Sequence, residues 1–138
     1  MSTTEIIAVL HSAHFKKGLL EGYGILVTPE KIVGAKKFKM GFFAALLLDE
    51  SKLDIATRMK AYEVAKEIEE NKDFEVTLSQ LLGLELKKPG RLWAGHLNIT
   101  SINGEHKVKI VAQTTGTEFR ILQTALTQFA PNVLNIIQ

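Results

Sequence analysis

The stretch that decides the fold is residues 97–110, LNITSINGEHKVKI. Apolar residues alternate with polar ones through both halves of this stretch, and a period of two is typical of a strand with one buried face. Between the halves stands Asn103-Gly104, a sequence strongly favoured in two-residue hairpin turns. Residues 97–110 therefore predict an antiparallel hairpin.

Further alternating segments on either side of this hairpin predict more strands. They lie at residues 5–15, 23–28, 32–39, 74–78 and 82–86. Thr28-Pro29-Glu30-Lys31 predicts a turn because proline fits a corner position, and Pro89-Gly90 is a strong turn signal.

Two segments predict helices. From Asp49 to Asn71, apolar residues recur at helical spacing and charged residues occupy the other faces, with Asp49 or Ser51 as the cap. A second helix begins at the capping box Thr115-x-x-Glu118 and ends at Ala130-Pro131. Because the helices are set apart from runs of strands, we expect an α+β fold rather than a parallel sheet.

Composition narrows the class of protein. The 138 residues suit one domain, and the absence of cysteine excludes disulfides, thiolate metal sites and cysteine nucleophiles. No targeting segment and no run of about 18 apolar residues is seen, so we expect a soluble cytoplasmic protein. The net charge of +2 is unevenly spread: residues 49–85 hold ten acids and five bases, whereas the rest holds five acids and twelve bases.

Catalytic and metal-binding motifs are not found in this sequence. His11-x-x-His14 falls in a predicted strand, where an odd spacing places two side chains on opposite faces, so we expect no metal site and no cofactor. The sequence has no nucleophile elbow, phosphate-binding glycine loop or zinc-protease motif. We therefore expect no enzyme, and His11, His14 or His96 would serve the catalytic alternative.

Lysines form local groups near the ends of the predicted strands, at Lys16-Lys17, at Lys36-Lys37 and at Lys87-Lys88. Lysines in such places commonly give solubility and protect strand edges, and a binding function requires the fold to gather them on one rim. Nucleic acid is not the expected partner, because stacking needs exposed aromatic residues and their share is only 7%.

The run Met40 to Leu48, MGFFAALLL, is the longest apolar stretch. One interpretation is a core connection or the start of the long helix. The other is an apolar patch for self-association or for insertion at a membrane surface, and of these two we favour self-association.

Residues 24–33, GILVTPEKIV, resemble the strand-turn-strand signature of bacterial pleckstrin-homology-like and GRAM-like domains. Residues 74–81, 95–104 and the helix from Thr115 are similar, in order, to the later elements of that family. The resemblance implies a single domain over residues 1–138, built as a bent antiparallel barrel of about six to seven strands with a C-terminal capping helix. The long helix would be an insertion at about residues 41–72.

The resemblance also implies a non-catalytic module that binds lipids, peptides or proteins. In lipid-binding members, head groups lie against basic residues of the loop that joins the first two strands. Lys16 and Lys17 occupy that position here, and Lys31, Lys36 and Lys37 are expected nearby.

Three functional hypotheses follow. The first is a scaffold that forms homo-oligomers and binds proteins, with an interface at Phe42, Phe43, Leu46, Leu47, Met59 and Tyr62. The second is weak peripheral binding to anionic membranes through the lysines, with Phe42 and Phe43 inserting. The third is an enzyme that uses His11, His14 or His96, which requires a concave pocket around these residues.

Overall fold

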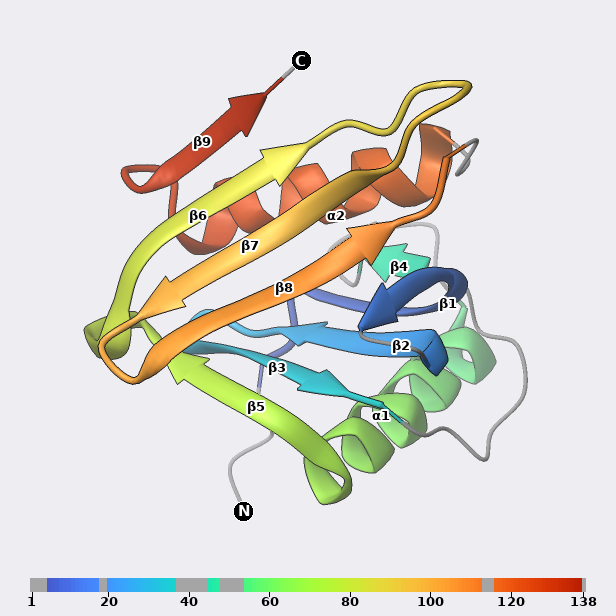
Figure 1. The fold of residues 1–138 in the computed structure, drawn as a ribbon. Helices are drawn as coiled ribbons and strands as arrows, with labels where there is room; N and C mark the ends of the chain where they lie inside the picture. Colours follow the sequence, from blue (N-terminus) through green and yellow to red (C-terminus); the bar gives the residue numbers. More distant parts are fainter. Residues whose placement is uncertain (1–4, 18–19, 37–44, 48–53, 113–115, 138) are drawn as a thin grey trace.

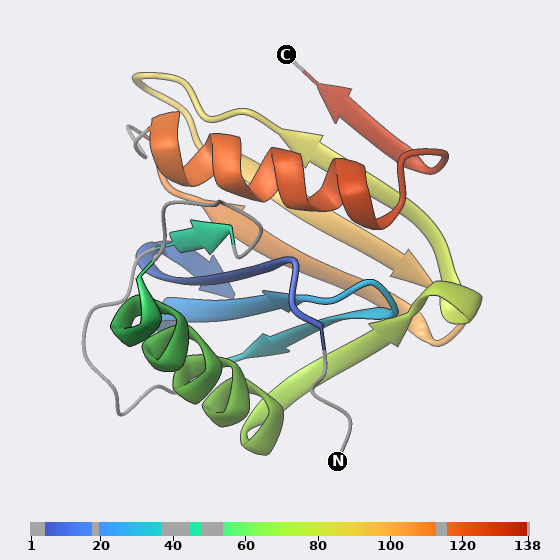
Figure 2. The same cartoon turned by 180° about the vertical axis from the view of Figure 1, so that it is seen from behind.

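The computed structural model describes residues 5–17, 20–36, 45–47, 54–112 and 116–137. The described residues form an α+β fold of nine strands, two α-helices and one short 3₁₀ helix. Figures 1 and 2 show two sheets that meet at β1, with one helix on each side of the first sheet.

The elements follow this order along the chain. The first part holds β1 (Ala8–Lys17), β2 (Leu20–Val27), β3 (Lys31–Ala35), β4 (Ala45–Leu47), α1 (Ile55–Glu70) and β5 (Lys72–Thr77). The second part holds the 3₁₀ turn η1 (Leu78–Gln80), β6 (Leu81–Lys87), β7 (Gly95–Ser101), β8 (Gly104–Ile110), α2 (Gly116–Phe129) and β9 (Leu134–Ile137).

β1 joins the two sheets. The strands follow one hydrogen-bonded path, β5-β3-β2-β1-β8-β7-β6-β9, and β4 pairs with β1 beside it. β1 pairs with β2 along its length, but meets β8 only at Phe15 and Lys16, beyond a register shift that follows Ser12. The path therefore bends within β1. It is not closed, because β5 and β9 end it and do not pair with each other.

The main hydrophobic core lies between the two sheets and under α2. Its largest fully buried side chains include Leu10, Ile25, Leu97 and Ile110 from the strands and Leu122 from α2. Figure 2 shows α2 lying along β6 and β7. The stripe of α2 that begins at Phe119 is buried in the main core, as its spacing predicts.

A second core lies on the opposite face of the first sheet, under α1. Val9, Leu26 and Val33 point to this side and pack with Val64 and Ile68 of the helix. The central strands are thus buried on both faces. This explains why their sequences are almost continuously apolar instead of alternating.

The long helix is shorter than the sequence predicts. It begins at Ile55, and its cap is Asp54, whose Oδ1 accepts a hydrogen bond of 2.7 Å from the Thr57 amide, instead of Asp49 or Ser51. Ala45–Leu47, which lie in the predicted helical insertion, form strand β4 beside β1. The other residues of the apolar run Met40 to Leu48 lie outside the described residues.

Two further expectations about local structure were wrong. The tight turn of the β7–β8 hairpin contains Ile102 and Asn103, because Ser101 pairs with Gly104. Gly104, at φ 131°, is the first residue of the return strand. The second error concerns the end of the chain: β9 follows the C-terminal helix and pairs with β6 in parallel.

Among the described residues, no helix has the length and apolar character needed to cross a bilayer.

Candidate interaction surfaces

Helix α1 presents an apolar row to solvent on the face opposite to its buried side. Ala61, Val64, Ala65 and Ile68 are buried against the sheet. Ile55, Met59 and Tyr62 recur at the same helical period but lie on the other side, with exposed fractions of 77%, 60% and 45%. We call these three residues the α1 stripe. Exposed large apolar side chains grouped in this way are typical of interaction surfaces.

The predicted interface residues divide into three groups. Met59 and Tyr62 are exposed and belong to the α1 stripe, and Ile55 joins them although the sequence analysis omitted it. Leu47 is buried in the main core, so it holds β4 in place and is not on the surface. Leu46 lies in β4 with its side chain outside the described set, and Phe42 and Phe43 lie outside the described residues.

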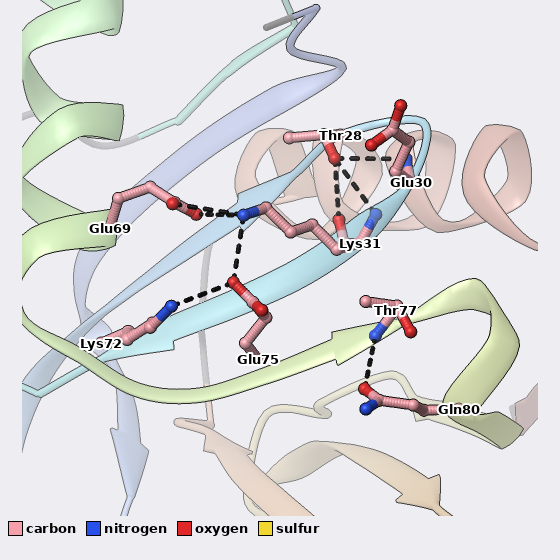
Figure 3. Close-up of polar contacts among 8 residues, drawn as sticks. All are labelled: Thr28, Glu30, Lys31, Glu69, Lys72, Glu75, Thr77 and Gln80. Atoms are coloured by element: carbon pink, nitrogen blue, oxygen red, sulfur yellow. Dashed lines mark hydrogen bonds and ion pairs between the residues drawn. The ribbon is translucent and has the colours of Figure 1, made fainter.

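The lysines of the predicted lipid site point to carboxylates of the same chain. Figure 3 shows Lys31 of β3 with its Nζ 2.9 Å from Glu69 Oε1 of α1 and 3.0 Å from Glu75 Oε1 of β5. Lys72 also contacts Glu75, at 3.2 Å. Burial alone would lower the pKa of Lys31, but its two carboxylate partners outweigh burial and raise that pKa.

The turn before Lys31 is fixed by a threonine. Thr28 Oγ1 accepts hydrogen bonds from the amides of Glu30 and Lys31, at 3.2 and 3.1 Å (Figure 3). Such side-chain bonds to the following amides stabilise tight turns. The predicted turn at Thr28 to Lys31 is confirmed, and it places Lys31 at the start of β3 beside Glu75.

A second group of lysines meets at Asp73, the second residue of β5. Lys17 Nζ lies 2.5 Å from Asp73 Oδ2, and Lys36 Nζ lies 3.3 Å from Oδ1. The buried Tyr23 hydroxyl donates to Oδ2 at 2.9 Å. Burial alone would raise the pKa of Asp73, but hydrogen bonds from Lys17 and Tyr23 hold it below its ordinary value of 3.8.

Side chains next to Asp73 also connect the two sheets. Phe74 stacks on His106 of β8 with ring centroids 4.5 Å apart, and Lys17 Nζ lies 5.2 Å from the centroid of the Phe74 ring. Burial, followed by the charge of Lys17, lowers the pKa of His106. Sequence reasoning missed Asp73 and His106, because only the fold brings β5 and β8 to Lys17.

Lys16, Lys17, Lys31 and Lys36 do not form one rim. Lys17 and Lys36 share Asp73, whereas Lys31 lies with Glu69 and Glu75. Lys16 faces Lys109 across the β1–β8 pairing. Lys37 lies outside the described residues. An anionic head group at Lys17 and Lys36, or at Lys31, would have to compete with the carboxylates that these lysines already contact.

The histidines lie at separate positions. His14 Nδ1 is 2.7 Å from the buried Glu118 of α2, whereas the pKa of His11 is lowered by burial and raised to a lesser degree by Glu67 of α1. His96 Nε2 is 2.7 Å from Glu85 on the second sheet. Among the residues that the structure describes, no group of three or more histidine or acidic side chains could hold a metal ion.

A hollow of about 310 Å³ lies between α2 and the last strand, and no histidine is among the residues that line it. Its lining comprises Lys88, Gly116, Phe119, Arg120, Gln123, Thr124 and Ile136. Two cationic side chains, Lys88 and Arg120, line this hollow together with polar and apolar residues.

Comparisons with protein-family models, with curated proteins and with solved structures gave no match. The account of function therefore depends on the geometry of these surfaces.

Proposed function

We propose that this chain is a non-catalytic scaffold module of pleckstrin-homology-like architecture that acts by self-association through α1 and by contacts with other proteins. The observation that carries the proposal is the α1 stripe. One buried apolar face is enough to hold α1 on the sheet. The exposed side chains of Ile55, Met59 and Tyr62 therefore add no stability to the isolated chain.

The architecture supports the family part of the proposal. Seven of the strands, from β5 through β1 to β6, form a bent antiparallel path, and α2 covers the core at one side. A bent antiparallel path with a helix beside the core supports this part of the proposal, although the path is open and does not close into a barrel. The open path, β4, α1 and β9 are the differences from that simple pattern.

The energetics suit a reversible association. Burying apolar surface contributes roughly 25 cal/mol per Å², and large side chains such as methionine and tyrosine dominate interface energies. A second copy of the chain is a suitable partner, because one contact between two copies can bury the α1 stripe of each. A partner protein with an apolar groove would use the same helix face.

The two alternatives have less support. For membrane binding, Lys17, Lys31 and Lys36 already contact carboxylates, which lowers the attraction they offer to anionic lipid. For catalysis, His11, His14 and His96 point to different parts of the fold and do not converge on the hollow beside α2.

The test is the mass of the purified protein by size-exclusion chromatography with light scattering. The wild-type protein is expected to have a mass above the 15.3 kDa of the monomer. The double variant Met59→Glu, Tyr62→Glu is expected to have the monomer mass. Ile102→Glu is the matched control, since Ile102 is 62% exposed, close to the 60% of Met59, but lies in the β7–β8 turn. Equal masses for wild type and the α1 variant would contradict the proposal.

A further inference from the structure

The hollow beside α2 gathers side chains from elements that are far apart in the sequence. Lys88 directly follows β6, Ile136 belongs to β9, and Phe119 and Arg120 belong to α2. In Figure 2 the chain that leaves β6 passes over the first turns of α2. The volume of about 310 Å³ lies at the lower end of the range for small-molecule sites, about 300–1,000 Å³, so the hollow can hold a small organic molecule.

Strand pairing explains why Lys88 and Ile136 line the same hollow. Ile136 is opposite Leu86 in the parallel pairing of β9 with β6, so the two side chains point to the same face of the sheet. Leu86 is buried in the main core, which α2 covers. Lys88 follows Leu86 by two residues and therefore lies on this face as well. The Lys88 amide donates to the Ile137 carbonyl at 3.2 Å, which holds the end of β6 against β9.

The α2 side of the hollow is one face of that helix. Its residues recur three or four positions apart, which places them one above another: Gly116, Phe119, Arg120, Gln123 and Thr124. Phe119 is buried and supplies an apolar surface, whereas Arg120 is exposed. Gln123 and Thr124 are partly buried, and their amide and hydroxyl groups can donate hydrogen bonds. The hollow thus combines hydrogen-bond donors with an apolar surface.

The two cations of the hollow have no carboxylate partner in the part of the chain that the structure describes. The elements around the hollow contain two acids, and both are bound elsewhere: Glu118 of α2 contacts His14, and Glu85 of β6 contacts His96. Glu118 is two residues from Arg120 and therefore lies on nearly the opposite side of α2. Strand β9 contains no acid. The chain itself therefore leaves the positive charge of the hollow without a counter-charge.

We propose that this hollow binds a small organic phosphate monoester. The phosphate contacts the two cations, and the organic part packs on Phe119 and Ile136. A phosphate monoester carries a charge of about −1.5 to −2 at pH 7, which balances both cations, whereas a monocarboxylate balances one. The guanidinium of Arg120 matches two phosphate oxygens, and the ammonium of Lys88 adds a point charge. A third oxygen remains for the donors on the next turn of α2.

This site is separate from the surfaces described above. It does not depend on the proposed self-association, because α1 packs on the first sheet and the hollow lies beside β6 and β9. Lys17, Lys31 and Lys36 are also cationic, but each already contacts a carboxylate. The cations of the hollow differ from them in having no such partner and in lining a concave surface.

Titration calorimetry with phenyl phosphate tests the proposal, because this probe joins a phosphate monoester to one aromatic ring. We expect a Kd below about 1 mM, weaker binding of inorganic phosphate and no binding of phenol. Arg120→Gln and Lys88→Gln should each raise the Kd of phenyl phosphate at least tenfold. Lys107→Gln is the matched control, since it removes an exposed lysine of β8 that does not line the hollow. Circular dichroism checks that each variant is folded.

Amide chemical shifts of the ¹⁵N-labelled protein locate the bound probe. Phenyl phosphate should shift the amides of Lys88, Gly116, Arg120 and Ile136. Shifts confined to the surroundings of Asp73 would overturn the proposal. A Kd that is the same in the wild type, in both hollow variants and in the control would also overturn it.

Vesicles distinguish a soluble ligand from a lipid head group, since phosphatidic acid carries a phosphate monoester at a membrane surface. Co-sedimentation with phosphatidic acid vesicles, but not with phosphatidylcholine vesicles, that Arg120→Gln abolishes would support the site with a lipid as its ligand. Binding of phenyl phosphate without vesicle binding would support the site with a soluble ligand. Binding of neither probe would overturn the proposal. Met59→Glu with Tyr62→Glu should bind phenyl phosphate as the wild type does, so this test and that of self-association can fail separately.

Discussion

Lys16 and Lys109 lie opposite each other in the short pairing through which β1 joins the two sheets. Only Phe15 and Lys16 of β1 pair with β8, so two lysines occupy half of this junction, and Glu21 of β2 is opposite Lys16 on the other side of β1. The like charges of Lys16 and Lys109 are an unfavourable element of this pairing.

Lys109→Glu should therefore stabilise the folded chain. Replacing a like-charge cross-strand pair by an opposite-charge pair is expected to raise the free energy of unfolding by about 0.2–1 kcal/mol. Urea denaturation below the association range measures this change. Lys107→Glu, also exposed on β8 but opposite Asn98, is the control and should leave stability nearly unchanged. A loss of stability in Lys109→Glu would refute the unfavourable pairing.

Asp73→Asn should destabilise the protein because one carboxylate holds three groups. Lys17, Lys36 and the buried Tyr23 hydroxyl all contact it, and the amide that replaces it has one acceptor and no charge. We expect a loss of about 1–3 kcal/mol in urea denaturation. The exposed Glu70→Gln should change stability by less than about 0.5 kcal/mol. Equal changes in the free energy of unfolding for the two substitutions would contradict this stabilising role of Asp73.

Acid should unfold the protein partly through Asp73 and Glu75. Hydrogen bonding to Lys31 lowers the pKa of Glu75 from its ordinary 4.5, and Lys17 and Tyr23 lower that of Asp73 from 3.8. A carboxylate with a depressed folded-state pKa contributes stability above its unfolded pKa and loses it as pH falls toward the folded value. The free energy of unfolding should therefore decline from pH 5 to pH 3. The decline should be shallower in Asp73→Asn, and an unchanged slope would contradict this account.

Gly34→Ala should be strongly destabilising, because Gly34 of β3 lies beneath two aromatic side chains. A Cβ there would overlap the Phe74 ring and lie 2.6 Å from the Tyr23 hydroxyl oxygen. Overpacking of this kind costs about 1–3 kcal/mol. Gly83→Ala is the control, since a Cβ on this β6 glycine meets nothing within 4 Å. Thermal unfolding that lowered Tm equally in both variants would argue against the close packing at Gly34.

Much of the fold could be predicted from local sequence patterns. The alternation at Leu97 and Ile99 and the helical spacing from Phe119 gave correct elements, because burial of one face sets these periods directly. β4 and β9 could not be predicted in this way. Each is short and apolar, and each is a strand only because β1 or β6 offers it an edge.

The interaction surfaces were predictable only in part. Met59 and Tyr62 share helical spacing with Ala65 and Ile68 in the sequence, but the structure buries Ala65 and Ile68 and leaves Met59 and Tyr62 exposed. Leu47 was assigned to an interface because an apolar run does not reveal whether it is buried, and the structure places it in the core. The cross-strand alignment of Lys16, Lys109, His96 and Lys87 remained hidden, since these residues are far apart in sequence and only register aligns them.

The most direct test of self-association through α1 is sedimentation equilibrium of the wild-type chain over a concentration series, beside Met59→Glu with Tyr62→Glu. We predict a wild-type mass that rises above 15.3 kDa with concentration, and a variant that stays at that mass while keeping its thermal transition. A wild-type chain that remains at 15.3 kDa throughout the series would contradict the central claim.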